Sequence, residues 1–162
     1  MPEPLTVLTE EESLFRDSVR RFARERLAPH VRSMDDAGVF RQDLLDEMFA
    51  LGLMAIDVPE EFGGPGGNFF QAILAIEELA KVDPSASVIV DVHNTLFNFA
   101  LLTWGTEEQK RRVLPKASAG ALASYALSEA GSGSDAFALQ TRAVEDGDGW
   151  TLTGRKLWIT NA

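Results

Sequence analysis

The sequence predicts an α+β fold, with an all-α domain over residues 1–120 and the start of an antiparallel β segment over residues 121–162. Two observations support this division. Apolar residues recur at three- and four-residue spacing, the period of an α-helix, as far as residue 115. After Gly120 the period changes to about two, which is typical of β-strands, and the turn sequence DGDG joins two of the strand-like runs. We therefore expect a helical domain followed by strands.

The first helix is predicted to run from Thr9 to Pro29. Thr9 and Glu12 form a capping-box pattern, and apolar residues then follow at helical spacing over about five turns. A second, shorter helix is predicted to end near Gly52. The stretch MAIDVPEEFGGPGGN that follows is rich in proline and glycine, so we expect a loop, with Asn68 placed to cap the next helix.

Three more helices complete the predicted helical domain. One covers residues 69–82 and ends at Asp83-Pro84. The next runs to Gly105 and is apolar nearly all round, which favours a central, buried helix. Thr106 and Gln109 form another capping box, before a brief helix that is expected to end near Leu114-Pro115. Five helices are thus expected over residues 9–115.

Four short strands are predicted after Gly120, in the runs LASYALS, LQTRAVE, GWTLTG and RKLWIT. The second and third are joined by DGDG as a hairpin. The last strand has neither a turn partner nor a second layer to cover it, which is a poor end for a domain. We therefore expect this chain to be the N-terminal portion of a longer protein.

Composition limits the location and the partners. The chain has no cysteine, which fits a reducing compartment, and its first residues do not resemble a secretory signal, so a cytoplasmic location is expected. Its most apolar stretches are interrupted by polar residues and fall short of the roughly 20 apolar residues of a membrane span. The net charge of −10 disfavours nucleic acid. The basic cluster Lys110–Arg112 is interpreted as a solvated helix face.

The stretch YALSEAGSGSDAFALQTRA contains a glycine-rich loop. Gly131, Gly133 and Ala136 satisfy the dinucleotide-binding pattern G-x-G-x-x-A directly after a predicted strand. That pattern requires a helix that begins at the loop and crosses over to a parallel strand. Only FALQTRAVE separates the loop from the DGDG turn, which is too short for such a crossover. A nicotinamide-binding fold is therefore not expected.

Two interpretations of this loop stay open on composition. It can be a plain connection built from small residues. It can also be a concavity for a diphosphate, because glycines let main-chain N–H groups converge on an anion and no bulky side chain blocks the approach. Hydroxyl groups would be supplied by Ser128, Ser132 and Ser134.

The motifs YALSEAGSGSD and DGDGWTLTGRKLWITNA resemble the signature of the acyl-CoA dehydrogenases. The helical half agrees in VPEEFGG, AIEELAK, VHNTL and WGTEEQKRRVLP, so the resemblance covers about residues 8–162. It implies that residues 121–162 begin an antiparallel β-barrel-like middle domain, and that a C-terminal helical bundle is absent from this chain. VDVHNTL, GTEEQK and LSEAGSGSDAFALQTRA are most similar to the short/branched-chain members, which act on 2-methyl-branched acyl-CoA thioesters. Where many relatives have threonine, proline and alanine, this chain has Ser128, Ala130 and Ser132.

The resemblance implies FAD as the cofactor. Ser128 and Thr160 would donate hydrogen bonds to the flavin, and Ser134 would also touch the pantetheine arm of the CoA thioester. The implied cofactor contacts are Tyr125, Leu127 and Ser128 along the isoalloxazine ring, Gly133 and Ser134 at the diphosphate, and Trp158, Ile159 and Thr160 beside the ring and its N5 position.

An acyl-chain cavity is a further expectation. Val88, Val92 and Leu96 lie one helical turn apart and resemble positions that line this cavity in relatives, although ordinary core packing explains them equally well. The β-branched valines would favour a short or branched acyl group. His93 lies in the same helix and is interpreted as a hydrogen-bonded core residue. Because His30 is the only other histidine, no metal site is predicted.

No catalytic residue is assigned to this chain. In the family, the base that removes the α-proton is a glutamate of the C-terminal bundle, so this chain alone is expected to be inactive. Glu129 is expected to be structural, bonding main chain or a neighbouring helix. The implied partners are an acyl-CoA thioester, an electron-transfer flavoprotein and other subunits in a homotetramer or homodimer. The alternatives are an acyl-CoA oxidase or flavin monooxygenase of the same fold, and a non-catalytic interaction module.

Overall fold

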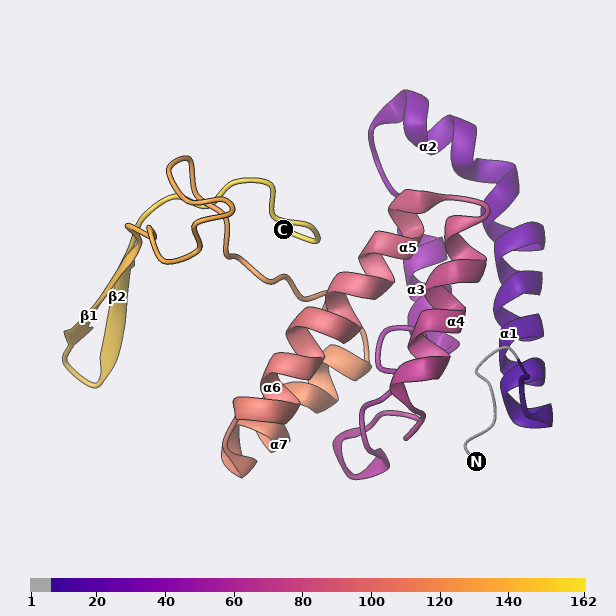
Figure 1. The fold of residues 1–162 in the computed structure, drawn as a ribbon, viewed down its shortest axis with the longest axis horizontal. Coiled ribbons are helices and arrows are strands. Elements are labelled where there is room, and N and C mark those ends of the chain that lie inside the picture. Colours follow the sequence, from indigo (N-terminus) through magenta and orange to yellow (C-terminus); the bar gives the residue numbers. More distant parts are fainter. Residues whose placement is uncertain (1–6) are drawn as a thin grey trace.

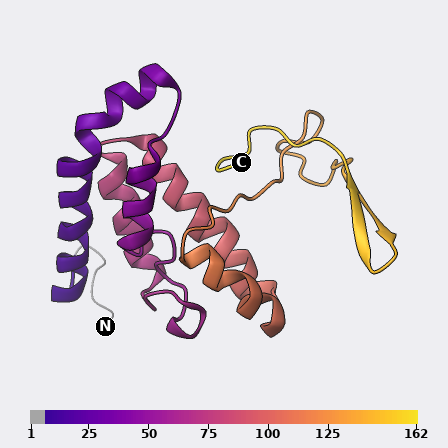
Figure 2. The same cartoon turned by 180° about the vertical axis from the view of Figure 1, so that it is seen from behind.

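The computed structural model describes residues 7–162. The helices pack into one body, and an extended segment leads from it to a β-hairpin on the far side (Figure 1; Figure 2). Residues 1–6, which hold part of the stretch judged to lack a secretory signal, lie outside the described residues.

The first helical stretch is longer than expected and changes its geometry along its length. The capping box is confirmed, because Thr9 Oγ1 accepts from Glu12 N at 3.2 Å and Glu12 Oε2 accepts from Thr9 N at 2.8 Å. Pro29 does not end the helix, as the sequence had suggested, because it lies in the first turn of a short 3-10 segment, where its missing N–H is not needed. The segments are α1 (Glu10–Phe22), the π-helix η1 (Ala23–Leu27), the 3-10 helix η2 (Ala28–His30) and α2 (Val31–Ala37).

Helices α3 (Gln42–Ala50) and α4 (Phe69–Ala80) are joined by a loop that contains one 3-10 turn, η3 (Glu60–Phe62). Asn68 caps α4 as predicted, since its Oδ1 accepts from Gln71 N at 3.0 Å. The loop therefore ends at Asn68, and α4, which packs against α1, begins at the next residue.

The next helical stretch consists of α5 (Pro84–Asp91), the π-helix η4 (Val92–Asn98) and α6 (Phe99–Trp104). The prediction that it is buried on all sides is wrong. Its α5 and η4 segments bury one face, but all six residues of α6 are at least partly exposed, and Trp104 is 73% exposed. The expectation arose because the helix carries apolar side chains on all of its faces. In this structure the rest of the chain covers only one of these faces.

Among the described residues, one helix, Pro84–Trp104, is long and apolar enough by length and composition to cross a membrane. The core helix of a soluble protein also meets these criteria of length and composition. In Pro84–Trp104, 39% of the most apolar stretch is buried inside this structure.

Helix α7 (Glu107–Ser118) begins at the predicted capping box, where Thr106 Oγ1 accepts from Gln109 N at 3.2 Å. It does not end at Pro115, which lies inside its last turn. Proline removes one hydrogen bond there. Packing keeps the turn helical, because Leu114 and Ala117 on either side of the proline are buried.

Two clusters of buried apolar side chains hold the helices together. The larger joins α1, η1, α2, α3, α4 and α5 and includes the fully buried Leu27, Leu44, Met48, Leu79 and Val90. Burying a leucine or valine contributes about 1.5–3 kcal/mol. The smaller cluster, Ala55, Val58, Phe62 and Leu114, packs the loop before α4 onto α7.

Asn94 of η4 fixes the same loop by polar contacts. Its Oδ1 accepts from Ile56 N at 2.9 Å, and its Nδ2 donates to Leu53 O at 2.9 Å and Val90 O at 2.8 Å. The side chain is fully buried. The loop and the helix are therefore locked in one arrangement.

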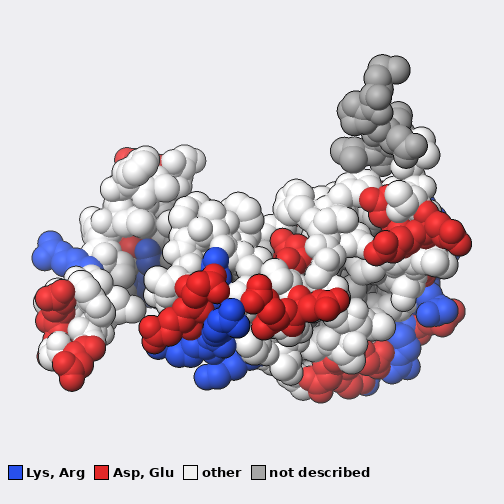
Figure 3. Space-filling model, turned by 90° about the horizontal axis from the view of Figure 1, so that it is seen from below, with Lys and Arg blue, Asp and Glu red and all other residues white. Residues whose placement is uncertain are grey.

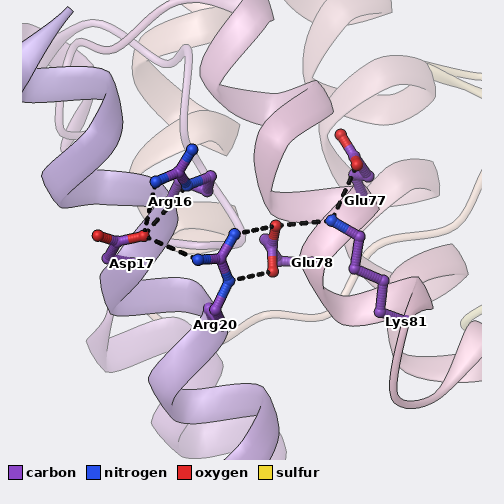
Figure 4. Close-up of polar contacts among 6 residues, drawn as sticks. All are labelled: Arg16, Asp17, Arg20, Glu77, Glu78 and Lys81. Atoms are coloured by element: carbon purple, nitrogen blue, oxygen red, sulfur yellow. Dashed lines mark hydrogen bonds and ion pairs between the residues drawn. The ribbon is translucent and has the colours of Figure 1, made fainter. Parts of the chain in front are cut away.

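An ionic cluster joins α1 to α4 (Figure 4). The Glu78 carboxylate, only 4% exposed, accepts two hydrogen bonds from Arg20, both at 2.9 Å, and one from Lys81 at 2.8 Å. Arg20 also contacts Asp17 at 3.2 Å. The hydrogen bonds from Arg20, and after them the one from Lys81, lower the pKa of Glu78 to about 2, against the effect of burial, which raises it. The carboxylate is therefore ionised at neutral pH and fixes the packing of α1 on α4.

The β segment forms two strands within the described residues, β1 (Arg142–Asp146) and β2 (Gly149–Thr153). They pair antiparallel with Asp146 opposite Gly149, as the DGDG turn predicted. The predicted strands LASYALS and RKLWIT are wrong, since neither forms a ladder here. The single main-chain bond between them, from Leu157 N to Ser128 O at 2.9 Å, is too little to make a strand pair.

Candidate functional site

Two segments predicted to contact a flavin cross each other. Leu157 N donates to Ser128 O at 2.9 Å, and Lys156 Nζ donates to Leu127 O at 2.9 Å. Lys156 Nζ also lies 2.8 Å from Glu129 Oε1. The crossing joins YALSEAG to KLWIT, although these motifs are almost thirty residues apart in the sequence. We refer to it as the motif crossing, residues 125–129 with residues 156–160.

Glu129 closes the glycine-serine loop onto the chain beyond it. Its carboxylate accepts from Gln140 N at 2.7 Å and from Thr141 N at 3.0 Å, in addition to the Lys156 ammonium. These donors, Lys156 first, lower the pKa of Glu129 to about 2. A carboxylate with this many partners is a weak proton acceptor, and its bonds to main-chain N–H groups match the structural role expected from the sequence.

The loop is also bonded internally. Glu129 and Ser132 exchange main-chain hydrogen bonds at 3.0 and 3.1 Å. Ser132 is 2% exposed and its Oγ donates to Asp135 O at 2.8 Å. Its hydroxyl therefore faces the loop, whereas Ser134 is exposed. Of these two serines, only Ser134 presents its hydroxyl to an outside ligand.

The eight predicted cofactor contacts lie along the motif crossing and its loop, on an open surface. Three large side chains are exposed there, and Trp158 is 93% exposed with a left-handed backbone at φ 59°. Gly131 and Gly133 have open space where a side chain would lie. In summary, Tyr125, Leu127, Gly133, Ser134 and Trp158 are exposed, and Ser128, Ile159 and Thr160 are partly buried.

The chemistry of this surface fits FAD. A planar flavin needs apolar and aromatic neighbours with hydrogen-bond donors at its edge, and exposed Trp158 and Tyr125 lie beside the hydroxyl-bearing Ser128 and Thr160. A diphosphate needs close approach to main-chain N–H groups, which the open surroundings of Gly131 and Gly133 permit. The residues present are therefore compatible with the cofactor that the sequence implied.

A groove of about 1090 Å³ lies beside the motif crossing, between α2, α5 and residues 160–162. Val88, Ile89, Leu122 and Thr160 are among its lining residues. The fold therefore brings one predicted acyl-cavity residue, Val88, to the same groove as one predicted flavin contact, Thr160.

Two other predicted acyl-cavity residues lie elsewhere. Val92 is 8% exposed and belongs to the buried side of η4, while Leu96 is 40% exposed. Neither lines the groove beside Val88. The one-turn spacing of the three residues places them along one helix, but this groove reaches only the first.

His93 is a fully buried core residue, as the sequence indicated. Its Nε2 lies 3.2 Å from Ala117 O, and its Nδ1 accepts from Ala123 N at 3.3 Å. Burial lowers the pKa of His93 to about 4, so the ring is neutral at pH 7. In the part of the chain that the structure describes, no group of three histidine or carboxylate side chains is placed to hold a metal.

Two residues of the basic cluster of α7, Lys110 and Arg111, pair with acidic groups. Arg111 lies 3.1 Å from Glu61 and 3.7 Å from Glu107, and Lys110 lies 3.6 Å from Glu107. On the face shown in Figure 3, basic and acidic side chains are interspersed. The positive charges of Lys110 and Arg111 are therefore balanced locally.

Lys156 and Asn161 were not predicted from the sequence as site residues. Lys156 joins the two segments of the motif crossing, and Asn161, the next residue after the crossing, joins the chain to α5 and to Ala123. Asn161 Nδ2 donates to Ile89 O and to Ala123 O, both at 3.2 Å. Each of these two residues has a feature that could have drawn attention to it. Lys156 is a charged residue in an otherwise apolar run, and Asn161 follows that run with the left-handed backbone, φ 67°, that asparagine tolerates.

A helical domain joined to a flavin-compatible motif crossing defines the class of protein, and comparison with known proteins gives the family. Residues 9–121 match the acyl-CoA dehydrogenase N-terminal domain, and residues 124–162 match the acyl-CoA dehydrogenase middle domain. The chain belongs to the acyl-CoA dehydrogenase family.

Individual relatives narrow the comparison. The chain is 48% identical over 161 residues to a probable short/branched chain specific acyl-CoA dehydrogenase of Dictyostelium discoideum, covering 99% of this chain and 39% of the relative. It is 42% identical over 159 residues to the mitochondrial short/branched chain specific acyl-CoA dehydrogenase of Bos taurus, covering 98% of this chain and 37% of the relative. The chain thus spans about 40% of the length of these relatives.

Solved structures agree with the fold. One is described as the electron transferring flavoprotein of Acidaminococcus fermentans, with a TM-score of 0.90 and 37% identity over 94% of this chain and 40% of the other. Another is a glutaryl-CoA dehydrogenase of Mycobacterium smegmatis in complex with FADH2, with a TM-score of 0.87 and 33% identity over 94% of this chain and 39% of the other.

Proposed function

We propose that this chain is part of an FAD-dependent acyl-CoA dehydrogenase that oxidises a short or 2-methyl-branched acyl-CoA to the 2,3-enoyl-CoA. The observation that carries the proposal is the motif crossing, which brings Leu127 and Ser128 beside Lys156 and Leu157, next to the groove that Val88 and Thr160 line. The relatives at 48% and 42% identity, both described as short/branched chain specific acyl-CoA dehydrogenases, support the short/branched-chain specificity.

Bound FAD would accept the substrate's β-hydrogen as hydride, which places negative charge on the ring. The chain's own part is to bind and orient. Ser128 and Thr160 would donate hydrogen bonds to the ring, Trp158 would flank it, and Gly133 and Ser134 would meet the diphosphate. Donors fixed in advance stabilise developing charge more than mobile water does, by about 3 kcal/mol for one donor.

The base for the α-proton is proposed to come from outside residues 7–162. Glu129 supplies a carboxylate within the motif crossing, but its oxygens are occupied by Lys156 and two main-chain N–H groups. A base needs a free oxygen within reach of the proton it removes. We therefore expect no dehydrogenation by the 162-residue chain alone.

The partners are also proposals. An acyl-CoA thioester as substrate follows from the family. An electron-transfer flavoprotein as electron acceptor is supported by the similar structure described as the electron transferring flavoprotein of Acidaminococcus fermentans. Homotetramer or homodimer assembly rests on the family resemblance. A cytoplasmic location is proposed because the chain has no cysteine, which fits a reducing compartment.

The test uses the complete reading frame that contains this sequence. The purified protein should carry FAD and reduce a dye with 2-methyl-branched acyl-CoA faster than with long straight-chain acyl-CoA. Ser128→Ala or Thr160→Ala should each lower the rate about 100-fold, as loss of one fixed donor does elsewhere. Thr153→Ala, on an exposed strand outside the motif crossing, is the control. Substrate-dependent oxygen consumption would indicate an oxidase instead, and absence of FAD would leave an interaction module.

Acyl specificity gives a second test. Val88→Gly enlarges the groove that Val88 lines and should raise the rate with longer acyl chains. Val92→Gly removes a buried side chain and should mainly lower stability. Unchanged chain-length preference in Val88→Gly would contradict a role for this groove in acyl binding.

A further inference from the structure

The main chain of Ala123 is held through both its N–H and its C=O by side chains from distant parts of the chain. Its N–H donates to His93 Nδ1 at 3.3 Å, and its C=O accepts from Asn161 Nδ2 at 3.2 Å. Ala123 follows the end of α7 at Ser118, and the extended segment between α7 and β1 leads away from the helical body (Figure 1). The position of Ala123 therefore determines the direction in which residues 124–128 run away from the helices.

His93 can make both of its contacts in one form only. Ala117 O is an acceptor, so Nε2 must carry the proton, and Ala123 N–H is a donor, so Nδ1 must be unprotonated. The ring is held in place by Phe49, edge-on at 5.8 Å between centroids, and by Phe97 at 6.0 Å. A fixed, neutral imidazole thus links the end of α7 to Ala123.

Asn161 links the other side of Ala123 to α5. Its amide donates to Ile89 O as well as to Ala123 O, both at 3.2 Å. Ile89 lies just before the change from α5 to the π-helix η4 at Val92. Side chains commonly insert at such breaks in the helical ladder. The residue next to Asn161 is Thr160, which lines the groove with Val88.

We propose that His93 and Asn161 are positioning residues for the flavin and acyl-CoA site: together they fix Ala123 and thereby hold the YALSEAG and KLWIT segments against α5. The proposal rests on the proposed function for the identity of the ligands. The arrangement itself needs no ligand, because all four hydrogen bonds join residues of this chain. Neither side chain is proposed to touch the reacting atoms.

The Asn161 test uses the ¹⁵N-labelled 162-residue chain without FAD or substrate. Asn161→Asp keeps the shape of the side chain but loses both N–H donors. Asn161→Gly removes the side chain, and glycine adopts the left-handed backbone of this position without strain. We expect NMR backbone order parameters for residues 158–160 of about 0.85 in the wild type and below about 0.6 in both variants. Protection of the α4 amides should not change. Equal order in wild type and variants, or a mobile wild-type segment, would overturn the proposal.

The His93 test separates its two bonds. Asn in place of His93 puts an oxygen near the Nδ1 position and can accept from Ala123 N–H, whereas Gln puts a donor near the Nε2 position and cannot. Exchange of the Ala123 amide should therefore be about tenfold faster in His93→Gln than in His93→Asn. Equal exchange in the two folded variants would overturn the role of His93. If neither variant folds, the Asn161 pair decides.

The same variants in the complete reading frame distinguish this proposal from the proposed function. Asn161→Asp should lower FAD retention and kcat while the midpoint of urea unfolding stays near that of the wild type. A wild-type protein without FAD contradicts the proposed function and leaves the ordering result standing. A variant with wild-type order and wild-type FAD retention contradicts the positioning role alone.

Discussion

Replacing Glu78 by glutamine should destabilise the helical domain by about 2 kcal/mol at neutral pH. The side chain is 4% exposed and receives three charge-assisted hydrogen bonds, two from Arg20 and one from Lys81. Breaking a fully buried pair costs about 3–5 kcal/mol. Here the arginine and lysine side chains are 34% and 51% exposed, so water can solvate them after the change, and the smaller figure follows.

The effect of Glu78→Gln should depend on pH in a defined direction. The pKa of Glu78 is lowered from 4.5 to about 2 in the folded chain, mainly by Arg20. A group with a depressed folded pKa contributes its stability above the unfolded pKa and loses it as the pH falls toward the folded value. The difference between wild type and variant should therefore be constant above pH 5.5, about one unit over 4.5, and shrink between pH 4.5 and pH 2.

The assay is urea unfolding followed by the helical circular dichroism signal at pH 7, 4 and 3. Glu77→Gln is the matched control, because Glu77 lies on the same helix, is 59% exposed and contacts only Lys81 among the described basic residues, at 2.9 Å. An exposed pair of this kind contributes about 0.5 kcal/mol. The reasoning is refuted if the two variants lose equal stability, or if the loss in Glu78→Gln is the same at pH 3 as at pH 7.

Three further predictions concern the loop, a glycine and Glu129. Asn94→Ala leaves buried main-chain groups without partners and should cost about 4 kcal/mol in urea unfolding; a loss below 1 kcal/mol would contradict this. Gly64→Ala places a Cβ on the Val58 carbonyl and should cost about 1–3 kcal/mol, whereas Gly131→Ala, which meets open space, should change stability by less than about 0.5 kcal/mol in the same assay. Glu129→Gln removes the charge that holds the glycine-serine loop and should speed amide exchange at residues 140 and 141, measured by NMR, while exchange in α4 stays the same.

Local signals predicted the beginnings of helices well. The capping boxes at Thr9 and Thr106 and the cap at Asn68 are all present, because a cap depends on residues within one turn of each other. Proline was a poorer guide to helix ends. Pro29 lies in a first turn, where its missing N–H is not needed. Pro115 lies in a last turn, which stays helical because Leu114 and Ala117 beside it are buried.

The sequence predicts candidate site residues, but it does not give their arrangement in space. The motifs named eight contacts toward a cofactor, and the structure places them along one crossing and its loop. Val88, Val92 and Leu96 looked equivalent by spacing, yet only Val88 lines the groove. Burial depends on which neighbouring helix covers each face, and this is set by packing rather than by the sequence of one helix.

The sequence by itself determined the class of fold, the helix starts, the DGDG hairpin, the buried His93 and the family motifs, since each depends on residue types at short spacing. Only the tertiary structure decided that Lys156 joins Leu127 to Glu129, and that His93 and Asn161 meet at Ala123. These bonds join residues 27 to 38 positions apart. Their partners are ordinary donors and acceptors, and only the folded path of the chain brings these distant segments within hydrogen-bond distance.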